Sequence, residues 1–177
     1  MRTALLITLL ALVLAAGLAS AGPLNLGLRV GMFQPMGSDL DLISDNWTFF
    51  GLEYGAGGVP TPWATIPLPF GERTVTIDYM KDSGDDGLNH YEAKMIPVLY
   101  RMREPLSDSF YWGGGIGISF NDFEANGIGD KSTDFAYEVG LGLLLGKSAV
   151  VELDYCDLGS GRGLDASGAR LSLTWFF

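Results

Sequence analysis

Few residues could carry out catalysis, because the chain has a single histidine, His90, and a single cysteine, Cys156. A covalent mechanism needs a nucleophile with a general base in reach. Ser83 precedes His90 at no diagnostic spacing, and Glu92 is the second residue after it. The sequence also lacks a Gly-x-Ser-x-Gly elbow, a phosphate-binding loop and a metal-ligating cluster of Cys and His. We therefore expect no catalytic residue, no cofactor and no metal site, and a structural role for Cys156.

Acidic residues are the most numerous candidates for binding, with 21 Asp and Glu against 11 Lys and Arg and a formal net charge of −10. Nucleic acids are excluded as partners, because phosphate binding needs clustered basic residues. Many of the acids fall in candidate loop segments: Asp39, Asp41, Asp45, Asp82, Asp85, Asp86, Asp122, Glu124, Asp130 and Asp134. The segment 82–87 lacks the spacing of a calcium-binding EF-hand loop. We expect solvated loops that could contact a ligand, with weak divalent-cation binding as the alternative.

Most of the other charges lie in segments that alternate between apolar and polar residues. In residues 149–157, Leu153 and Tyr155 alternate with Glu152 and Asp154. Comparable alternation occurs in residues 24–34, 47–55, 73–81, 90–102, 109–121, 133–145 and 169–177. A period of two is typical of a β-strand with two different faces. The sequence therefore predicts an all-β domain of about eight strands.

The segment 90–102 has the least regular alternation of the eight. We place Glu92 and Lys94 on its polar face, and we place on its apolar face Tyr91, Ala93, Met95 and Leu99. Pro97 lacks the N–H that a strand donates to its neighbour, so we expect a bulge or local distortion there.

The N-terminal residues have the pattern of a cleaved secretory signal peptide. A basic start at Arg2 precedes an apolar stretch over residues 4–18, and Ala19-Ser20-Ala21 supplies the small residues that signal peptidase requires. We therefore expect residues 1–21 to be removed and residues 22–177 to form one domain. Beyond residue 21, no apolar run approaches the ~18 residues of a membrane-spanning helix.

The C-terminal segment, residues 169–177, alternates most strictly. Leu171, Leu173, Trp175 and Phe177 share one face, and the sequence given ends on an aromatic residue. This segment resembles the final strand of bacterial outer-membrane β-barrels, whose terminal aromatic is read by the barrel assembly machinery. The resemblance implies an assembly signal formed by these four residues.

Nearly the whole of residues 22–177 resembles the small eight-stranded outer-membrane barrels, the class that includes the OmpA membrane domain, OmpX-like and opacity-type proteins. The features that carry the resemblance are Ala19-Ser20-Ala21, the terminal residues 171–177 and the aromatic and glycine-rich segment 110–120. It implies a closed, up-and-down, antiparallel transmembrane β-barrel in the outer membrane. It also implies lipids and the assembly machinery as partners, and a structural or surface-interaction role in adhesion or envelope integrity.

The aromatic residues of the apolar faces fall near the ends of the predicted strands, as the two interfacial girdles of a membrane barrel would. We expect a periplasmic girdle of Tyr54, Phe110, Trp112, Trp175 and Phe177. We expect an outer girdle of Tyr79, Tyr91, Phe120, Phe135, Tyr137 and Tyr155.

The polar faces would then place charges in a narrow lumen: Arg29, Glu53, Asp78, Glu92, Lys94, Glu138, Glu152, Asp154 and Arg170. Buried charges need partners. Arg170 could reach Glu152 or Asp154, and Arg29 could reach Glu53 or the last strand. We favour a salt-bridged plug, and a narrow channel that prefers cations is the alternative.

The connections agree with a barrel except at one place. Residues 103–108 and 146–148 are short, as on a periplasmic side, whereas residues 35–46, 82–89, 122–132 and 158–168 are longer and polar, as on an extracellular side. The connection 56–72 is unexpectedly long and contains four prolines.

Two further alternatives stay open. A secreted lipocalin-type barrel would have the same alternation of apolar and polar residues, but its apolar faces would turn inward and line a ligand pocket. A lipid-modifying outer-membrane enzyme would use His90.

Overall fold

The computed structural model describes residues 26–37, 45–55, 72–85, 89–145, 149–161 and 164–176. The expected signal peptide at 1–21, the Pro-rich connection at 56–71 and the terminal Phe177 lie outside the described residues. Within the described part of the chain, no helix is long and apolar enough to span a bilayer.

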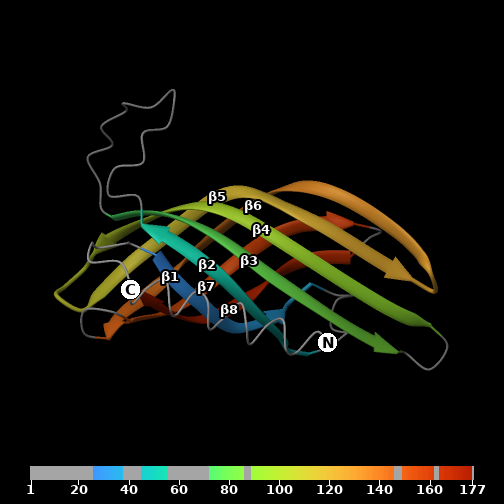
Figure 1. Ribbon diagram of the computed structural model, residues 1–177, viewed down its shortest axis with the longest axis horizontal. Coiled ribbons are helices and arrows are strands. Elements are labelled where there is room, and N and C mark those ends of the chain that lie inside the picture. The colour runs from blue at the N-terminus through green and yellow to red at the C-terminus, as the bar shows by residue number, and fades with distance from the viewer. Residues whose placement is uncertain are drawn as a thin grey trace, which may run out of the picture.

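The described residues form eight strands that close into one barrel (Figure 1). The strands are β1 (Leu26–Pro35), β2 (Trp47–Gly55), β3 (Glu72–Asp85), β4 (His90–Pro105), β5 (Phe110–Ala125), β6 (Ile128–Leu145), β7 (Ala149–Gly161) and β8 (Leu164–Phe176). Each strand pairs antiparallel with its neighbours in sequence, and β1 pairs antiparallel with β8. The predicted up-and-down barrel is therefore confirmed.

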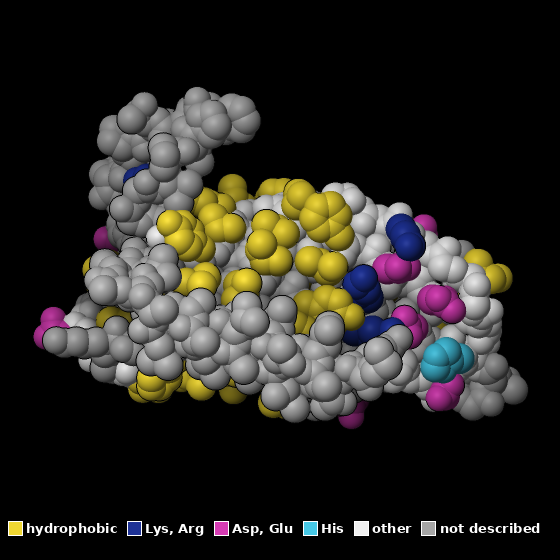
Figure 2. Space-filling view, in the orientation of Figure 1, with side chains coloured by type: hydrophobic (Ala, Val, Ile, Leu, Met, Phe, Trp, Pro, Cys, Tyr) yellow, Lys and Arg dark blue, Asp and Glu magenta, His cyan; other side chains and the backbone are white. Residues whose placement is uncertain are grey.

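The apolar faces point outward. In β8, Leu171 and Trp175 are 50% and 55% exposed, whereas Arg170, Ser172 and Thr174, which alternate with them, are buried. On the face that Figure 2 shows, hydrophobic side chains gather over much of the outer surface of the barrel. This orientation rules out the lipocalin-type alternative, in which Leu171, Leu173 and Trp175 would line an internal pocket.

The prediction for β4 was wrong, because its two faces are exchanged. Ala93, Met95 and Leu99 point inward and are fully buried, whereas Glu92 and Lys94 lie on the outer face. The cause is that the lumen is itself apolar where these three residues lie, so apolar character does not mark the lipid side of this strand. Tyr91 packs against the same internal residues and does not belong to an outer girdle.

No bulge occurs at Pro97, but the expected local distortion does, because the pairing of β3 with β4 is interrupted between Val98 and Met95. Ile77 lies opposite Val98 and Met80 lies opposite Met95, so the register between β3 and β4 is the same on both sides of Pro97. The described register shift lies instead between Asp157 and Ser160, where β7 pairs with β8.

Several strands extend into segments that were predicted to be loops. The expected loop 122–132 is a hairpin in which β5 and β6 are joined by only Asn126 and Gly127. Both have positive φ, 52° and 79°, as a two-residue type I′ turn requires, and Asn-Gly is its usual sequence. Strands also cover much of the expected loops 82–89 and 158–168, so β3 to β6 project beyond β1 and β2 (Figure 1).

The interior contains an apolar cluster in the half of the barrel away from the start of β1 and the end of β8. We call this half the distal half, and the other the terminal half. The apolar cluster consists of Phe33, Trp47, Phe49, Met80, Ala93, Met95, Leu99, Phe123, Ala136, Cys156, Leu158 and Ala166. Its packing includes an edge-to-face contact of Phe33 and Trp47, with ring centroids 6.1 Å apart. The barrel is therefore filled with side chains in its distal half.

Candidate functional site: the charged layer of the lumen

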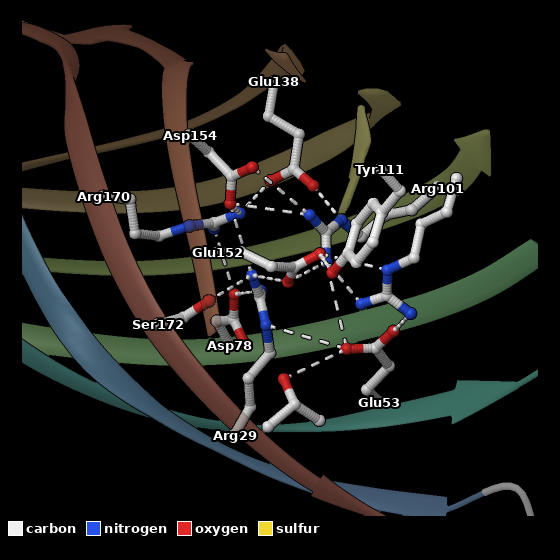
Figure 3. Close-up of polar contacts among 12 residues, drawn as sticks. Arg29, Glu53, Asp78, Arg101, Tyr111, Glu138, Glu152, Asp154, Arg170 and Ser172 are labelled. Carbon is white, nitrogen blue, oxygen red and sulfur yellow. Dashed lines mark hydrogen bonds and ion pairs between the residues drawn. The ribbon is translucent and has the colours of Figure 1, made fainter. Parts of the chain in front are cut away.

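Charged side chains fill the terminal half of the lumen and point toward one another (Figure 3). This charged layer consists of four arginines and five acids: Arg29, Arg101, Arg103, Arg170, Glu53, Asp78, Glu138, Glu152 and Asp154. They come from every strand except β5, and none is more than 4% exposed. The layer therefore carries a formal charge of −1 in a region that solvent does not reach.

Asp78 joins the two arginines on β1 and β8. Its Oδ2 accepts hydrogen bonds from Arg29 at 2.6 Å and from Arg170 at 3.1 Å. Arg29 also donates to Ser172 Oγ at 3.2 Å, and Arg170 pairs with Glu138. A single carboxylate of β3 is thereby bonded to two strands that are not its neighbours.

Glu152 joins the two arginines on β4 in the same way. Its Oε2 accepts a hydrogen bond from Arg101 at 2.7 Å, and its Oε1 accepts one from Arg103 at 3.0 Å. The hydroxyl of Tyr111 donates to Oε1 at 2.7 Å. Glu53 is the second partner of Arg103, at 2.5 Å. Glu152 therefore has donors on β4 and β5, neither of which is a neighbour of its own strand in the barrel.

Aromatic rings border the charged layer on both sides. The guanidinium groups of Arg29 and Arg170 lie 5.7 and 5.5 Å from the centroid of Phe49, a member of the apolar cluster. Toward the terminal end, the guanidinium of Arg103 lies 5.4 Å from the ring of Tyr111 and 6.0 Å from that of Phe176. At these distances cation–π attraction stabilises the arginines where water is excluded.

The structure brings together seven of the nine charges that the sequence placed in the lumen: Arg29, Glu53, Asp78, Glu138, Glu152, Asp154 and Arg170. Of the expected pairings, Arg170 reaches Asp154 at 3.5 Å, and Arg29 reaches both Glu53 at 3.9 Å and Ser172 on the last strand. The other two, Glu92 and Lys94, lie on the outer face of β4.

Sequence reasoning missed Arg101, Arg103 and Tyr111. One signal could have found the two arginines. They lie on the same face of the strand as Met95 and Leu99. An arginine that faces the middle of a bilayer destabilises a barrel by about 2–4 kcal/mol. That face of β4 therefore had to be the lumen.

The aromatic residues expected at the ends of the barrel lie mostly on its outer face. Tyr54, Phe110, Trp112 and Trp175 are exposed toward the terminal end, and Phe120, Phe135, Tyr137 and Tyr155 are exposed toward the distal end. Tyr79 is partly exposed and lies 5.2 Å from Phe50 between ring centroids. Exposed aliphatic residues such as Ile77, Leu141 and Leu153 lie between the two sets.

The single histidine lies on the exposed distal rim, where His90 Nδ1 is 2.9 Å from Asp85 Oδ1. Cys156 is fully buried in the apolar cluster. Among the described residues, no group of three His, Cys, Asp or Glu could hold a metal ion.

The sequence matches no protein-family model and no curated protein. Its fold matches solved structures of outer-membrane barrels. The attachment invasion locus protein Ail of Yersinia pestis is 15% identical with a TM-score of 0.56, and the match covers 88% of this chain and 100% of that one. Ail in complex with the heparin analogue sucrose octasulfate is 14% identical with a TM-score of 0.58, covering 86% and 97%. Neisserial surface protein A is 9% identical with a TM-score of 0.55, covering 88% and 99%.

Proposed function

The chain has the fold of the small eight-stranded bacterial outer-membrane β-barrels, and from this premise we propose that it acts in the outer membrane as a closed structural barrel with an interaction surface at its distal end. Residues 1–21 would direct its export and be cleaved. The assembly machinery would recognise the end of β8 through Leu171, Leu173, Trp175 and Phe177.

The observation that carries this proposal is the filling of the lumen by two different layers. The charged layer of the terminal half and the apolar cluster of the distal half each span the barrel. An eight-stranded barrel is just wide enough for side chains to fill it. A barrel filled in this way suits anchoring and surface contact better than transport.

The burial of the charges argues against the channel alternative. A cation path needs acids that water can reach, whereas Glu53, Asp78, Glu138 and Glu152 are at most 3% exposed. Each of these acids also has an arginine partner. We expect the protein to produce no discrete conductance steps in planar bilayers.

The distal end offers the surface for interaction. Within the described residues, β6 pairs with β7 only from Tyr137 onward, so residues 128–136 pair with β5 alone, and residues 128–131 are exposed. This hairpin carries acidic residues, including Asp122 and Glu124 on β5 and Asp130 on β6. The fold relative Ail forms a complex with a heparin analogue, which is a polyanion. Because this chain is acidic here, we infer that its own ligand is neutral or cationic.

A lipid-modifying enzyme is the less supported alternative. Its only histidine candidate is exposed and bonded to Asp85, and no described hydrogen bond joins His90 to a serine hydroxyl. Unchanged lipid profiles in cells that carry H90A would exclude this role.

The experiment that tests the proposal combines membrane fractionation with gel electrophoresis in SDS, boiled and unboiled. Closed barrels resist SDS until heated, because every strand edge in the membrane is paired. We expect a heat-dependent mobility shift in the outer-membrane fraction. A protein in the soluble fraction without such a shift would contradict the proposal.

A further inference from the structure

The distal ends of β3 to β6 project beyond β1 and β2 as a four-stranded sheet (Figure 1). Alternation along these strands, counted from the buried residues Met80 and Ala136, gives the sheet one side that continues the inner wall of the barrel. Backbone pairing sets eight residues of that side in two rows. The first row, nearer the lumen, is Asp82, Ala93, Phe123 and Asp130, and the second row is Gly84, Tyr91, Ala125 and Ile128. We call these eight residues the inner distal face.

The middle of the inner distal face is apolar, and its second row reaches water. Ala93 and Phe123 are buried members of the apolar cluster. In the second row, Ile128 is 62% exposed. Its pairing partner Ala125 lies five residues beyond Phe120 of the outer girdle, about 17 Å along the strand. Ile128 is therefore an apolar side chain that lies beyond the lipid-facing surface and is not covered by the rest of the described chain.

An acid lies at each end of the first row, Asp82 on β3 and Asp130 on β6. Asp82 accepts a hydrogen bond from the backbone N–H of Ser83 at 2.8 Å, and neither acid has an ion pair among the described residues. The described ion pairs of β3 to β6 at this end all join side chains of the outer face. No described lysine, arginine or histidine lies on the inner distal face. The face therefore carries negative charge that no described cation balances.

The spacing of the two acids sets the length of a segment that could reach both. Asp82 and Asp130 are separated by the three spacings between β3 and β6, which place their backbones about 14 Å apart. An extended peptide advances about 3.4 Å per residue, so four residues cover the same length. The first, third and fifth residues of such a peptide point to the same side. Basic side chains at the first and fifth positions would match the acids, and an apolar side chain at the third would match the apolar middle.

We propose that the inner distal face binds an extended cationic peptide segment of another protein, with the pattern basic–x–apolar–x–basic. The two basic side chains pair with Asp82 and Asp130, and the apolar side chain between them packs on Ala125 and Ile128. Binding of this kind gives the two acids the cations that they lack and removes Ile128 from water. This inference rests on the proposed function, because it names the site and the class of partner for the interaction surface at the distal end.

The test measures binding of a dye-labelled peptide, Lys-Thr-Leu-Thr-Lys with both ends capped, by fluorescence anisotropy. The protein is refolded in phosphatidylcholine vesicles, whose lipids carry no net charge that would attract the peptide. We expect saturable binding to the wild type. D82N and D130N should each weaken it about threefold, as the loss of one exposed ion pair does, and the double variant about tenfold, because distant sites add. I128T should also weaken binding, because it removes apolar contact and leaves both acids in place.

The matched control is E124Q, which removes one negative charge from the outer face of the same hairpin and should leave the affinity unchanged. Equal losses in E124Q and D130N would overturn the proposal, because the peptide would then respond to overall charge and not to one face. Equal affinity of the wild type and D82N/D130N would overturn it as well. Spermine has the charges of the peptide without its apolar side chain, so equally tight binding of spermine would exclude a peptide as the specific occupant.

A heat-dependent mobility shift is measured on each sample, so that a folding defect is not mistaken for a loss of binding. A wild type that inserts and shows the shift but does not bind the peptide would contradict this site alone. A wild type that does not insert would contradict the proposed function.

Discussion

Arg101 on β4 donates a hydrogen bond across the lumen to Glu152 on β7, with 2.7 Å between Nη1 and Oε2. The two strands are not neighbours in the barrel. The bond therefore joins parts of the wall that backbone pairing does not join directly. Glu152 also accepts hydrogen bonds from Arg103, Tyr111 and Arg29, so three of the four arginines of the charged layer bond to it.

Replacing Glu152 should destabilise the barrel strongly. E152Q would leave Arg101 and Arg103 with less compensation in a buried site, and removing one partner of a buried ion pair costs about 3–5 kcal/mol. The measurement is urea unfolding of the protein refolded in vesicles. E124Q is the matched control, since Glu124 is exposed, and it should stay within about 0.5 kcal/mol of the wild type. Equal stability of the two variants would show that the charged layer contributes little.

Two adjacent phenylalanines should respond differently to the same substitution. Phe49 is fully buried between the apolar cluster and Arg29, so F49A would leave a cavity and cost about 3–5 kcal/mol. Phe50 is 48% exposed on the outer face, where lipid can fill the space left by F50A. We expect F50A to cost much less in the same urea titration. A larger loss for F50A would mean that the two faces of β2 are exchanged.

The orientation of β4 can be tested with single cysteines in a C156S background. E92C should react with a water-soluble maleimide on intact cells, because Glu92 lies on the outer face of the distal end. A93C should not react until the barrel is unfolded, because Ala93 is fully buried. Rapid labelling of A93C with protection of E92C would restore the orientation that the sequence predicted.

The turn between β5 and β6 should depend on its glycine. Gly127 has a φ of 79°, a backbone conformation that residues with a side chain rarely adopt. G127A should therefore lower the stability of the barrel by about 1 kcal/mol, although the space around Gly127 is open. Gly129 also has room for a Cβ, and its backbone has no such restriction, so G129A serves as the control. Urea unfolding compares the two variants. A loss of the same size in both variants would show that the cost does not come from the positive φ of Gly127.

The strands that could be predicted from the sequence are those with only one apolar face. In β8, Leu171 and Leu173 alternate with Ser172 and Thr174, so the lipid side is unambiguous. In β5, glycines and polar residues together occupy most of the inner positions, so its lipid side is also unambiguous. Across the barrel, the alternation of the sequence placed seven charges of the charged layer inside, and all seven are buried there.

The parts that could not be predicted are those in which both faces are apolar. Trp47 and Phe49 fill the lumen while Phe50 faces outward, so the sequence of β2 has no clear period at its start. The same mixture misled the prediction for β4. The distal apolar cluster is formed by residues far apart in the chain, and their contacts exist only after the barrel closes.

The charged layer also gives the cross-section of the barrel its shape. Backbone pairing fixes the spacing between neighbouring strands, but it does not by itself prevent a ring of eight strands from flattening into an oval. The hydrogen bonds of Asp78 and Glu152 cross the lumen and join strands that are not neighbours. Flattening the barrel would therefore break ion pairs in an interior that water does not reach. The barrel should therefore stay round under the lateral pressure of the bilayer and hold its projecting hairpins at a constant separation.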